Sequence, residues 1–452
     1  MRSAAPARLT RQPPAESPPF LPAGEYLTRA IDLGYVEEEW FATGEDGAGR
    51  PYSTQVLVRR PKDPARFSGV VLVEPLHIHR VAPIYMYSSP YILRSGHGWA
   101  CVASQKSALD AHVKPSNPQR YASLHIETDA PPGGVRTDLT SPPFRGASAG
   151  VRTAWWDQLA RFNQASSAVL AQVGAALRAA GPFAAVSHVL LVGHSQTGFV
   201  TTNFIREAHE SQRLPGGAPV FDGFFPSGWP TIAFSPCDVP LVQVLSDGDI
   251  SDPNFSFQPG HEGRRYRRPD GDSPGDRYRL YELASVPHMG TRYPPHDDPG
   301  MWQQVATAGA IPLDATMNSL PHHELFDMSL HHLVQWVARG AAPPRADRIE
   351  VGADGYFAKD EQGNSRGGVR CVQLDVPRAT YHPNPLNPDG TPGFGTIGTE
   401  VPFDKAKMQA LYGNPASYLE RFNRRLDELI DEGWFLAEDS EGMRAEAREQ
   451  KW

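Results

Sequence analysis

The sequence predicts an α/β fold in which a mostly parallel central sheet is flanked by helices. Short runs of Val, Leu and Ile, bounded by Gly or Pro, recur along the chain, as is typical of strands buried on both faces of a sheet. Segments with apolar residues at helical spacing separate these runs. Strands that alternate with helices in this way form a parallel sheet covered on both faces.

The first part of the chain supplies three strands and a long irregular segment. YSTQVLVRR (52–60) alternates polar and apolar residues, which suits an edge or half-buried strand, whereas GVVLVEPL (69–76) is continuously apolar. A helix is expected over 84–94, followed by the strand GWACVAS (98–104). Residues 105–150 are rich in Pro, Gly and Ser without any period, so we interpret them as a cap or cover insertion.

The middle of the chain continues the alternation. Apolar residues near helical spacing predict a helix between Trp155 and Leu177, closed by Gly181–Pro182. A second helix is expected from Phe199 to about Glu210. Further strands are expected at VSHVLLV (186–192), VFDGFFPSG (220–228), VPLVQVLSDGD (239–249) and RYRLYELAS (277–285), and a further helix over 324–339.

The two ends of the chain differ from this middle part. The first 22 residues are rich in proline and are expected to be disordered. Residues 23–345 are expected to form the core, which includes the cover insertion at about 105–150. Residues 346–452 are a C-terminal helical extension, loop-rich at first, with an amphipathic helix that starts at Asn414–Pro415. We expect this extension to pack on the core.

Composition excludes several classes of function. The 452 residues carry a net charge of −8, so the chain lacks the basic character of a sequence-independent nucleic-acid binder. Three cysteines, Cys101, Cys237 and Cys371, are too few for a disulfide framework and have no metal-type spacing. No run of about 18 apolar residues predicts a membrane span, and the N-terminus has no apolar segment typical of a secretory signal. We therefore expect a cytoplasmic protein with no nucleic-acid or membrane partner.

The segment LLVGHSQTG (190–198) carries the strongest catalytic signal. A strand ends at Gly193, Ser195 follows, and helix signals come next, which is the pattern of a nucleophile elbow. Small neighbours let chain segments approach there, and the serine hydroxyl stands clear of the sheet. The second small position holds Thr197, and the glycine comes one residue later, at Gly198. The alternative interpretation is that Ser195 only caps the helix.

A nucleophilic serine needs a histidine base and a carboxylate that orients this base. In an α/β-hydrolase sheet the acid and then the histidine follow the serine along the chain. Asp247 and Asp249 come after one predicted strand, and His288 comes after the next. We prefer Asp249 as the acid, because it lies three residues past the strand, and Asp247 is the alternative. Asp222, at the start of its strand, is interpreted as structural.

An oxyanion hole needs two backbone N–H groups directed at the developing negative charge. The N–H of Gln196, directly after the serine, is the first candidate. The second is expected from the VEPLHIHR loop, where Leu76 and His77 are the candidates. Glu74, at the end of that strand, either binds Arg80 or a substrate group, or is a buried carboxylate satisfied by local N–H groups.

These segments resemble those of a family of large bacterial proteins labelled as alpha/beta hydrolase domain-containing. VVLVEPLHI is similar to the family's V-V-V-E-W-L-N-V segment, with Pro75 and His77 where Trp and Asn are usual. GWACVASQKS is similar to G-x-A-x-V-x-V-S-A-Q, and VGHSQTGFV resembles the G-x-S-Q-S-(A/G) elbow. YELASVPHMG is similar to E-V-A-G-T-x-H and places His288 on the family histidine. GNSRGGVR and TEVPFDKAKMQALY resemble C-terminal segments of the family, so the likeness covers most of the chain.

The resemblance implies a serine hydrolase with the α/β-hydrolase fold, acting on carboxylic esters or related acyl bonds, in which the C-terminal extension is an integral part. Aromatic residues near strand ends favour an apolar or aromatic substrate. The pocket candidates are Trp229, Phe199, Trp155 and Met289.

Other polar groups have a structural and a functional interpretation. His323 and Asp327 lie one helical turn apart, which suggests a metal site, but we interpret them as the polar face of a helix. The stretch from Arg264 to Arg268 either contacts an anionic substrate or is a solvated insertion. His194, beside the nucleophile, is expected to pack or hydrogen-bond locally. No metal and no cofactor is expected.

We therefore expect a cofactor-free serine esterase with Ser195, His288 and Asp249 as its triad and a small-molecule ester or lactone as its substrate. A lactonase, an acyltransferase or a hydroxynitrile lyase could use the same residues. A haloalkane dehalogenase is excluded, because it needs a carboxylate where Ser195 stands. The alternative from another class is a non-catalytic binding protein with the hydrolase fold.

Overall fold

The computed structural model describes residues 2–14, 19–22, 33–128, 157–179, 181–251, 264–290, 316–386 and 396–452. The chain divides into two compact units. The first comprises Met1–Leu241, Gly271–Tyr278 and Leu333–Ala341, and the second comprises Val242–Asp270, Arg279–His332 and Ala342–Trp452. This division differs from the expected boundary at residue 345, because part of the expected core clusters with the C-terminal extension.

The first unit is built on a sheet that carries the elbow segment. Its strands are β2 (Arg8–Arg11), β3 (Tyr35–Glu45), β4 (Pro51–Pro61), β5 (Val70–Pro75), β6 (Gly98–Val102), β7 (His125–Ile126), β8 (His188–His194) and β10 (Gly223–Ser227). Their order is β10-β8-β5-β6-β4-β3-β2, with β7 paired to β4. Strands β10, β8, β5 and β6 are parallel, and the N-terminal strands add an antiparallel side. The predicted α/β fold with its mostly parallel central sheet is confirmed.

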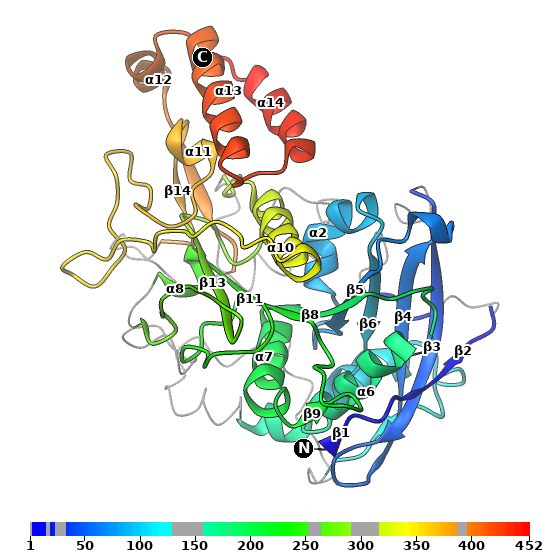
Figure 1. The fold of residues 1–452 in the computed structure, drawn as a ribbon. Coiled ribbons are helices and arrows are strands. Elements are labelled where there is room, and N and C mark those ends of the chain that lie inside the picture. The colour runs from blue at the N-terminus through cyan, green and yellow to red at the C-terminus, as the bar shows by residue number, and fades with distance from the viewer. Residues whose placement is uncertain are drawn as a thin grey trace. The chain divides into compact units, whose positions relative to one another are not determined.

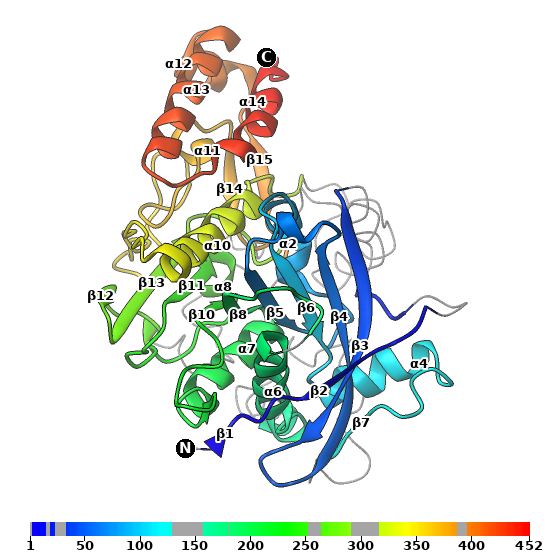
Figure 2. The same cartoon turned by 45° about the vertical axis from the view of Figure 1, so that its right-hand side comes forward.

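Helices cover both faces of this sheet. α2 (Pro83–Arg94) lies on one face, and α6 (Ser166–Ala179) and α7 (Gln196–Asn203) lie on the other (Figure 1 and Figure 2). α7 continues as the π-helical segment η4 (Phe204–Ala208), and a short 3-10 helix, η1 (Pro64–Arg66), precedes β5. In the predicted helix up to Leu177, residues 157–162 are helical and a turn separates them from α6. Trp155 lies outside the described residues.

The N-terminal segment differs from the prediction of disorder. β2 pairs antiparallel with β3, and β1 (Arg2–Ser3) pairs with β9 (Gln212–Arg213). Further along, the side chain of Phe20 is buried, and its backbone N–H donates to the Tyr121 hydroxyl at 2.7 Å. The proline-rich composition concealed these long-range contacts.

β4 is not the edge or half-buried strand that its alternation suggests. It lies between β3 and β6 and is buried on both faces. Its polar side chains are paired across the sheet, because Arg59 donates to Glu37 at 2.9 Å and Gln55 donates to Glu39 at 2.5 Å. A buried polar group that is hydrogen-bonded in this way can occupy an interior strand.

The expected cover insertion begins as helix. Residues 106–116 form α3 (Lys106–Ala108), the π-helical segment η2 (Leu109–Val113) and α4 (Lys114–Ser116). Leu109 and Val113 are fully buried, which fixes this short helical run against the sheet. Residues 129–150 of the insertion lie outside the described residues.

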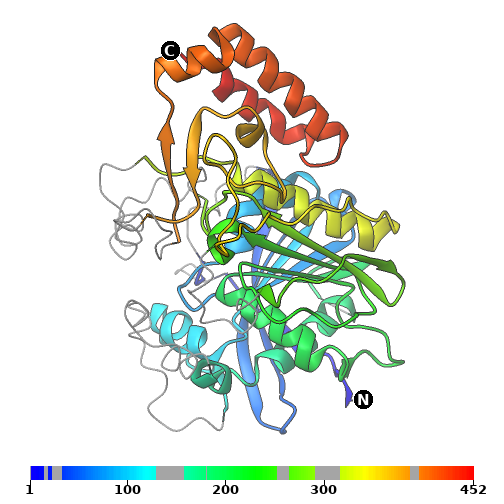
Figure 3. The ribbon, with the colours of Figure 1, turned by 90° about the vertical axis from the view of Figure 1, so that its left-hand side faces the viewer.

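The second unit contains most of β11 (Leu241–Ser246), then α8 (Asp247–Ile250), and the C-terminal elements. These are α11 (Val372–Asp375), β14 (Ala379–His382), β15 (Thr399–Pro402), α12 (Lys405–Tyr412), α13 (Pro415–Asp431), the 3-10 helix η7 (Ala437–Asp439) and α14 (Ser440–Arg448). β14 and β15 pair antiparallel, and α13 and α14 lie side by side (Figure 3). α13 begins as predicted, with the Asn414 side chain accepting from the N–H of Ser417 at 3.0 Å.

Three elements remain. β12 (Gly271–Ser273) belongs to the first unit, whereas β13 (Asp276–Leu283) and α10 (His322–Arg339) have residues in both units. In the second unit, polar contacts tie β13 to the C-terminal segment. Glu282 accepts two hydrogen bonds of 2.7 Å from Arg267 and one of 2.8 Å from the N–H of Ile349. Tyr281 and His332 pair at 3.0 Å, and His332 also contacts the Gly433 carbonyl at 3.0 Å.

None of the helices in the described part of the chain is both long and apolar enough to cross a membrane. Cys101, Cys237 and Cys371 are buried thiols and are not joined in disulfides.

Candidate active site

The turn between β8 and α7 holds Ser195 in the backbone conformation of a nucleophile elbow. Its φ of 59° and ψ of −125° lie in a region that non-glycine residues rarely adopt. The N–H of Ser195 donates to the carbonyl of Ser227, at the end of β10, at 3.0 Å. Its side chain makes no capping hydrogen bond to α7, so the alternative that Ser195 only caps the helix has no support in the geometry.

Thr197, at the position where a small residue is usual, stabilises this turn through its hydroxyl group. Its hydroxyl accepts from the His194 N–H at 2.9 Å and donates to the His194 carbonyl at 2.8 Å. The close approach that usually requires a glycine two residues after the serine occurs one residue later, because a Cβ on Gly198 would overlap the Ser227 carbonyl. A Cβ on Gly193 would likewise overlap the backbone of Thr197. The shifted glycine in the sequence therefore matches the packing of the turn.

Aromatic rings line the elbow in the first unit. Tyr87 meets the ring of His194 edge-on at 5.5 Å, and His194 hydrogen-bonds to the Ser227 hydroxyl at 3.0 Å, which confirms its local packing role. Phe199 and Trp229 contact each other with ring centroids 5.0 Å apart. Trp229 is 5% exposed, and it packs beside the start of α7, because a Cβ on Gly198 would lie 3.4 Å from its own Cβ.

The expected second oxyanion donors, Leu76 and His77, are wrong for this structure. The N–H of Leu76 donates to the Val102 carbonyl at 2.8 Å, because the chain continues the β5–β6 ladder for one more residue. The N–H of His77 donates to the Val81 carbonyl at 3.0 Å and closes a turn. Ile78 is held less closely, because its N–H contacts the side-chain oxygen of Gln196 at 3.4 Å.

Glu74 is a buried carboxylate satisfied by local donors. It accepts from the N–H groups of Ile84 at 2.7 Å and Tyr85 at 3.1 Å, at the start of α2, and from Trp99 Nε1 at 2.9 Å. Burial raises the pKa of Glu74 to about 7, although these three donors oppose the shift. Of the two interpretations from the sequence, the structural one holds.

In the second unit, His288 and Asp249 form a hydrogen-bonded dyad. His288 Nδ1 lies 2.5 Å from Asp249 Oδ1. The other carboxylate oxygen of Asp249 accepts from the N–H and the hydroxyl of Ser246, at 2.7 and 2.8 Å, in a capping box at the start of α8. The side chains of Asp249 and His288 are only 3% and 14% exposed. A carboxylate fixed in this way can orient an imidazole.

Asp247 supports the backbone around the dyad. One of its oxygens accepts from the Ser285 N–H at 3.0 Å and from the Ser365 hydroxyl at 2.5 Å. Ser285 has a positive φ of 56°, and its carbonyl accepts from Asn318 at 3.0 Å. These contacts hold the chain three residues before His288 in a strained conformation. Asp247 is therefore a structural acid in this unit.

His322 approaches the histidine of the dyad from α10. Its Nε2 lies 3.3 Å from the His288 carbonyl, and its ring stacks on Phe326 with centroids 4.6 Å apart. Burial, together with the nearby charge of His323, lowers the pKa of His322 to about 3. Its imidazole is therefore neutral in the folded protein near pH 7.

The other polar groups singled out in the sequence are structural where they are described. Arg178 pairs with Asp222, whose carboxylate also accepts from the Val189 N–H at 2.7 Å. Arg264 donates to the carbonyls of Ile250 and Gly355, both at 2.9 Å. Together with the contact of Arg267 to Glu282, these contacts indicate a structural role for the two arginines. The stretch was expected either to contact an anionic substrate or to be a solvated insertion.

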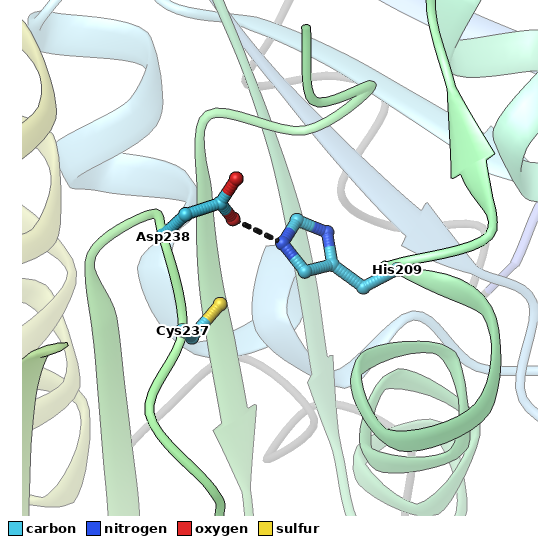
Figure 4. A group of neighbouring side chains, drawn as sticks. All are labelled: His209, Cys237 and Asp238. Carbon is cyan, nitrogen blue, oxygen red and sulfur yellow. Dashed lines mark hydrogen bonds and ion pairs between the residues drawn. The ribbon is translucent and has the colours of Figure 1, made fainter. Parts of the chain in front are cut away.

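The described residues contain one group with donor atoms suited to a metal, and this group does not include His323 or Asp327. His209, Cys237 and Asp238 place one donor atom each within 4.8 Å of one another (Figure 4). Asp238 already accepts from His209 at 2.6 Å and from Arg213 at 2.8 Å. Although burial opposes it, these hydrogen bonds hold the pKa of Asp238 below its usual value. Because Arg213 neutralises the carboxylate of Asp238, we interpret the group as a structural ion pair that links Asp238 to His209 and Arg213.

The expected site residues thus fall into both units. Ser195, Gln196, Leu76, His77, Phe199 and Trp229 belong to the first, and Asp247, Asp249, His288 and Met289 belong to the second. Met289 is half-buried, and its N–H donates to the Thr396 carbonyl at 2.7 Å. Sequence patterns missed Gln105, Ser285, Asn318 and Ser365, because their contacts come from distant parts of the chain.

The fold and the elbow define an α/β hydrolase. A family model described as "Alpha/beta hydrolase domain" matches residues 5–445, nearly the whole chain, and the chain therefore belongs to this family. The resemblance stated from the sequence is confirmed. No curated protein matches the chain.

Several solved structures are similar to the chain at low identity. An acetyl xylan esterase from Paenibacillus sp. R4 is 11% identical, with a TM-score of 0.33, over 67% of this chain and 89% of that one. A putative dienelactone hydrolase from Klebsiella pneumoniae is 11% identical, with a TM-score of 0.29, over 62% and 99%. The poly(3-hydroxybutyrate) depolymerase LpqC from Bordetella parapertussis is 12% identical, with a TM-score of 0.28, over 70% and 94%. The assignment rests on the family match.

Proposed function

We propose that this protein is a serine hydrolase that cleaves a carboxylic ester bond with Ser195, His288 and Asp249. The proposal is carried by two observations, one on the elbow segment around Ser195 and one on the segment that contains His288. Ser195 sits in a strained elbow at φ 59°, and His288 is hydrogen-bonded to a fixed carboxylate at 2.5 Å. Backbone strain of the kind seen at Ser195 gathers at functional sites, and a carboxylate-bound imidazole is the base that a serine nucleophile requires.

In the proposed reaction, Ser195 Oγ attacks the ester carbonyl while His288 Nε2 takes the hydroxyl proton. Asp249 keeps the other imidazole nitrogen, Nδ1, protonated and stabilises the imidazolium. The bond between the carbonyl carbon and the alcohol oxygen then breaks, and His288 returns the proton to the departing alcohol. Water, deprotonated by His288, releases the acid from the acyl-enzyme and restores Ser195.

The oxyanion is proposed to bind the N–H of Gln196, which begins α7 and so has no intrahelical acceptor. The second donor is proposed to be the N–H of Ile78, because its bond to Gln196, at 3.4 Å, is longer than those of the Leu76 and His77 N–H groups, at 2.8 and 3.0 Å. The contact between Phe199 and Trp229 supports an apolar or aromatic group in the substrate. A lactonase or an acyltransferase would use the same residues.

Hydrolysis of p-nitrophenyl esters from acetate to decanoate tests the proposal. Ser195→Ala should abolish turnover, whereas Ser211→Ala, at an exposed serine of the same unit, should match the wild type. Equal rates in all three proteins would refute a serine nucleophile. Ring opening of aliphatic lactones, measured by pH-stat, would identify a lactonase. Transfer of the acyl group to an added alcohol would identify an acyltransferase. A protein inert to all these substrates and to fluorophosphonate is the non-catalytic binder.

A further inference from the structure

A reciprocal pair of buried glutamines joins the elbow to the cover insertion. Gln196 Nε2 donates to Gln105 Oε1 at 2.6 Å, and Gln105 Nε2 donates to Gln196 Oε1 at 3.0 Å. The two side chains are 4% and 0% exposed. Two amides that face each other in this way satisfy a donor and an acceptor on each side, which a buried amide requires.

The pair also reaches the loop after β5. Gln105 Nε2 donates to the Leu76 carbonyl at 2.9 Å, and the N–H of Ile78 contacts Gln196 Oε1 at 3.4 Å. The loop is thus attached at two points to the amide pair. All of these residues belong to the first unit.

Gln105 is itself held from behind. Asn163 Nδ2 donates to Gln105 Oε1 at 3.3 Å, and Asn163 Oδ1 accepts from the N–H and the hydroxyl of Ser107, each at 3.1 Å. The orientation of the Gln105 amide is therefore fixed, because a flipped amide would oppose acceptor to acceptor at the Leu76 carbonyl and donor to donor at Asn163 Nδ2.

We propose that Gln105 is a positioning residue for the oxyanion hole. Its side chain holds two segments in one arrangement: Gln196, whose backbone N–H is the first proposed donor, and the Leu76–Ile78 loop, which supplies the second. The inference rests on the proposed hydrolase function and adds a residue to it. Donors that are fixed before the reaction need no reorganisation when negative charge develops, which is where such sites gain most of their effect.

The test compares Gln105→Ala, Gln196→Ala and the double variant in ester hydrolysis. Misplacement of a donor should lower kcat by about 10- to 100-fold, with KM within about threefold because substrate binding is not altered. The double variant should lose no more than the larger single loss, because the two side chains act as one unit. Gln105→Glu should resemble Gln105→Ala, because a carboxylate cannot donate to the Leu76 carbonyl.

Gln55→Ala is the matched control. Gln55 is also a buried glutamine of the first unit, but its amide contacts Glu39 and the Phe20 carbonyl. It should lose stability as Gln105→Ala does and keep kcat. Hydrogen exchange of the peptide that covers residues 76–81 adds a readout that needs no turnover: exchange should rise in Gln105→Ala and stay unchanged in Gln55→Ala.

The outcomes separate the two proposals. A wild type that hydrolyses esters beside a Gln105→Ala variant with unchanged kcat or unchanged exchange overturns the positioning role alone. Equal loss of kcat in Gln55→Ala also overturns it, since the effect would then reflect general destabilisation. A wild type that neither hydrolyses esters nor reacts with fluorophosphonate overturns the proposed function and, with it, this inference.

Discussion

Asp249→Asn changes one atom of the dyad and should remove nearly all activity. In the wild type, Asp249 Oδ2 accepts from Ser246, which leaves Oδ1 to face His288 Nδ1 at 2.5 Å. An asparagine must keep its carbonyl oxygen on the Ser246 N–H, because that group can only donate. Its NH₂ group then faces Nδ1, which must become the acceptor.

The consequence is the wrong histidine tautomer. With Nδ1 as an acceptor, the proton of neutral His288 moves to Nε2, which can no longer take the proton of Ser195. Such a change is expected to lower kcat by about 10⁴-fold, equivalent to about 5 kcal/mol in activation free energy. The folded structure should persist, because the capping contacts to Ser246 are kept.

The assay is steady-state hydrolysis of p-nitrophenyl butyrate, with urea unfolding as a check of stability. Asp247→Asn is the matched control: its side-chain oxygen can still accept from Ser285 and Ser365, so kcat should stay within a few-fold of the wild type. The assignment of the acid is refuted if Asp249→Asn stays within tenfold of the wild type. If Asp247→Asn loses the larger factor, the acid is Asp247.

Three further predictions concern the scaffold. Thr197→Val keeps the side-chain volume but leaves the His194 N–H without its 2.9 Å acceptor, so unfolding in urea should show a loss of about 1–3 kcal/mol; an unchanged midpoint would mean that this hydrogen bond is unimportant. Ser365→Ala removes a hydroxyl donor from Asp247 and should lower both kcat and stability, whereas a change in neither would contradict its role in holding the dyad. Burial, and secondarily the nearby His331 charge, lowers the pKa of His332 to about 3 from 6.5, so the unfolded chain binds a proton below pH 6.5 that the folded chain does not. Stability should therefore fall with decreasing pH, by about 1.4 kcal/mol per pH unit from this residue, and His332→Gln should show a smaller slope between about pH 4 and 6; an equal slope would contradict the shift.

The residues that could be predicted from the sequence are those marked by local pattern. Ser195 follows a buried strand and precedes a helix, and Asp249 and His288 each come just after a strand, so short segments are enough to single them out. The choice of Asp249 over Asp247 also followed from its distance past the strand. In the structure the carboxylate of Asp249 is hydrogen-bonded to His288 Nδ1.

The supporting residues could not be found in this way, because their contacts are distant in sequence. Ser365 bonds to a carboxylate 118 residues away, and Gln105 bonds to Gln196 across 91 residues. The oxyanion donors Leu76 and His77 were wrong for a related reason. Whether a backbone N–H is free depends on the strand and turn that receive it, here Val102 and Val81, and no local pattern reports that.

The N-terminal strands also depend on long-range contacts that the local sequence does not reveal. A proline-rich composition predicts disorder, yet β2 joins the sheet by pairing with β3. β4 alternates in sequence as an edge strand does, but its polar side chains find partners such as Glu37 and Glu39. Hydrophobic pattern alone cannot distinguish an exposed polar residue from a buried one that is paired.

Covalent labelling of Ser195 by a fluorophosphonate tests the central claim most directly. After digestion and mass spectrometry, the wild type should carry the phosphonate on the peptide that contains Ser195, and Ser195→Ala should carry none. His288→Ala should label far more slowly, because the serine then has no base. Label on another residue, or equal labelling of the wild type and Ser195→Ala, would contradict the account.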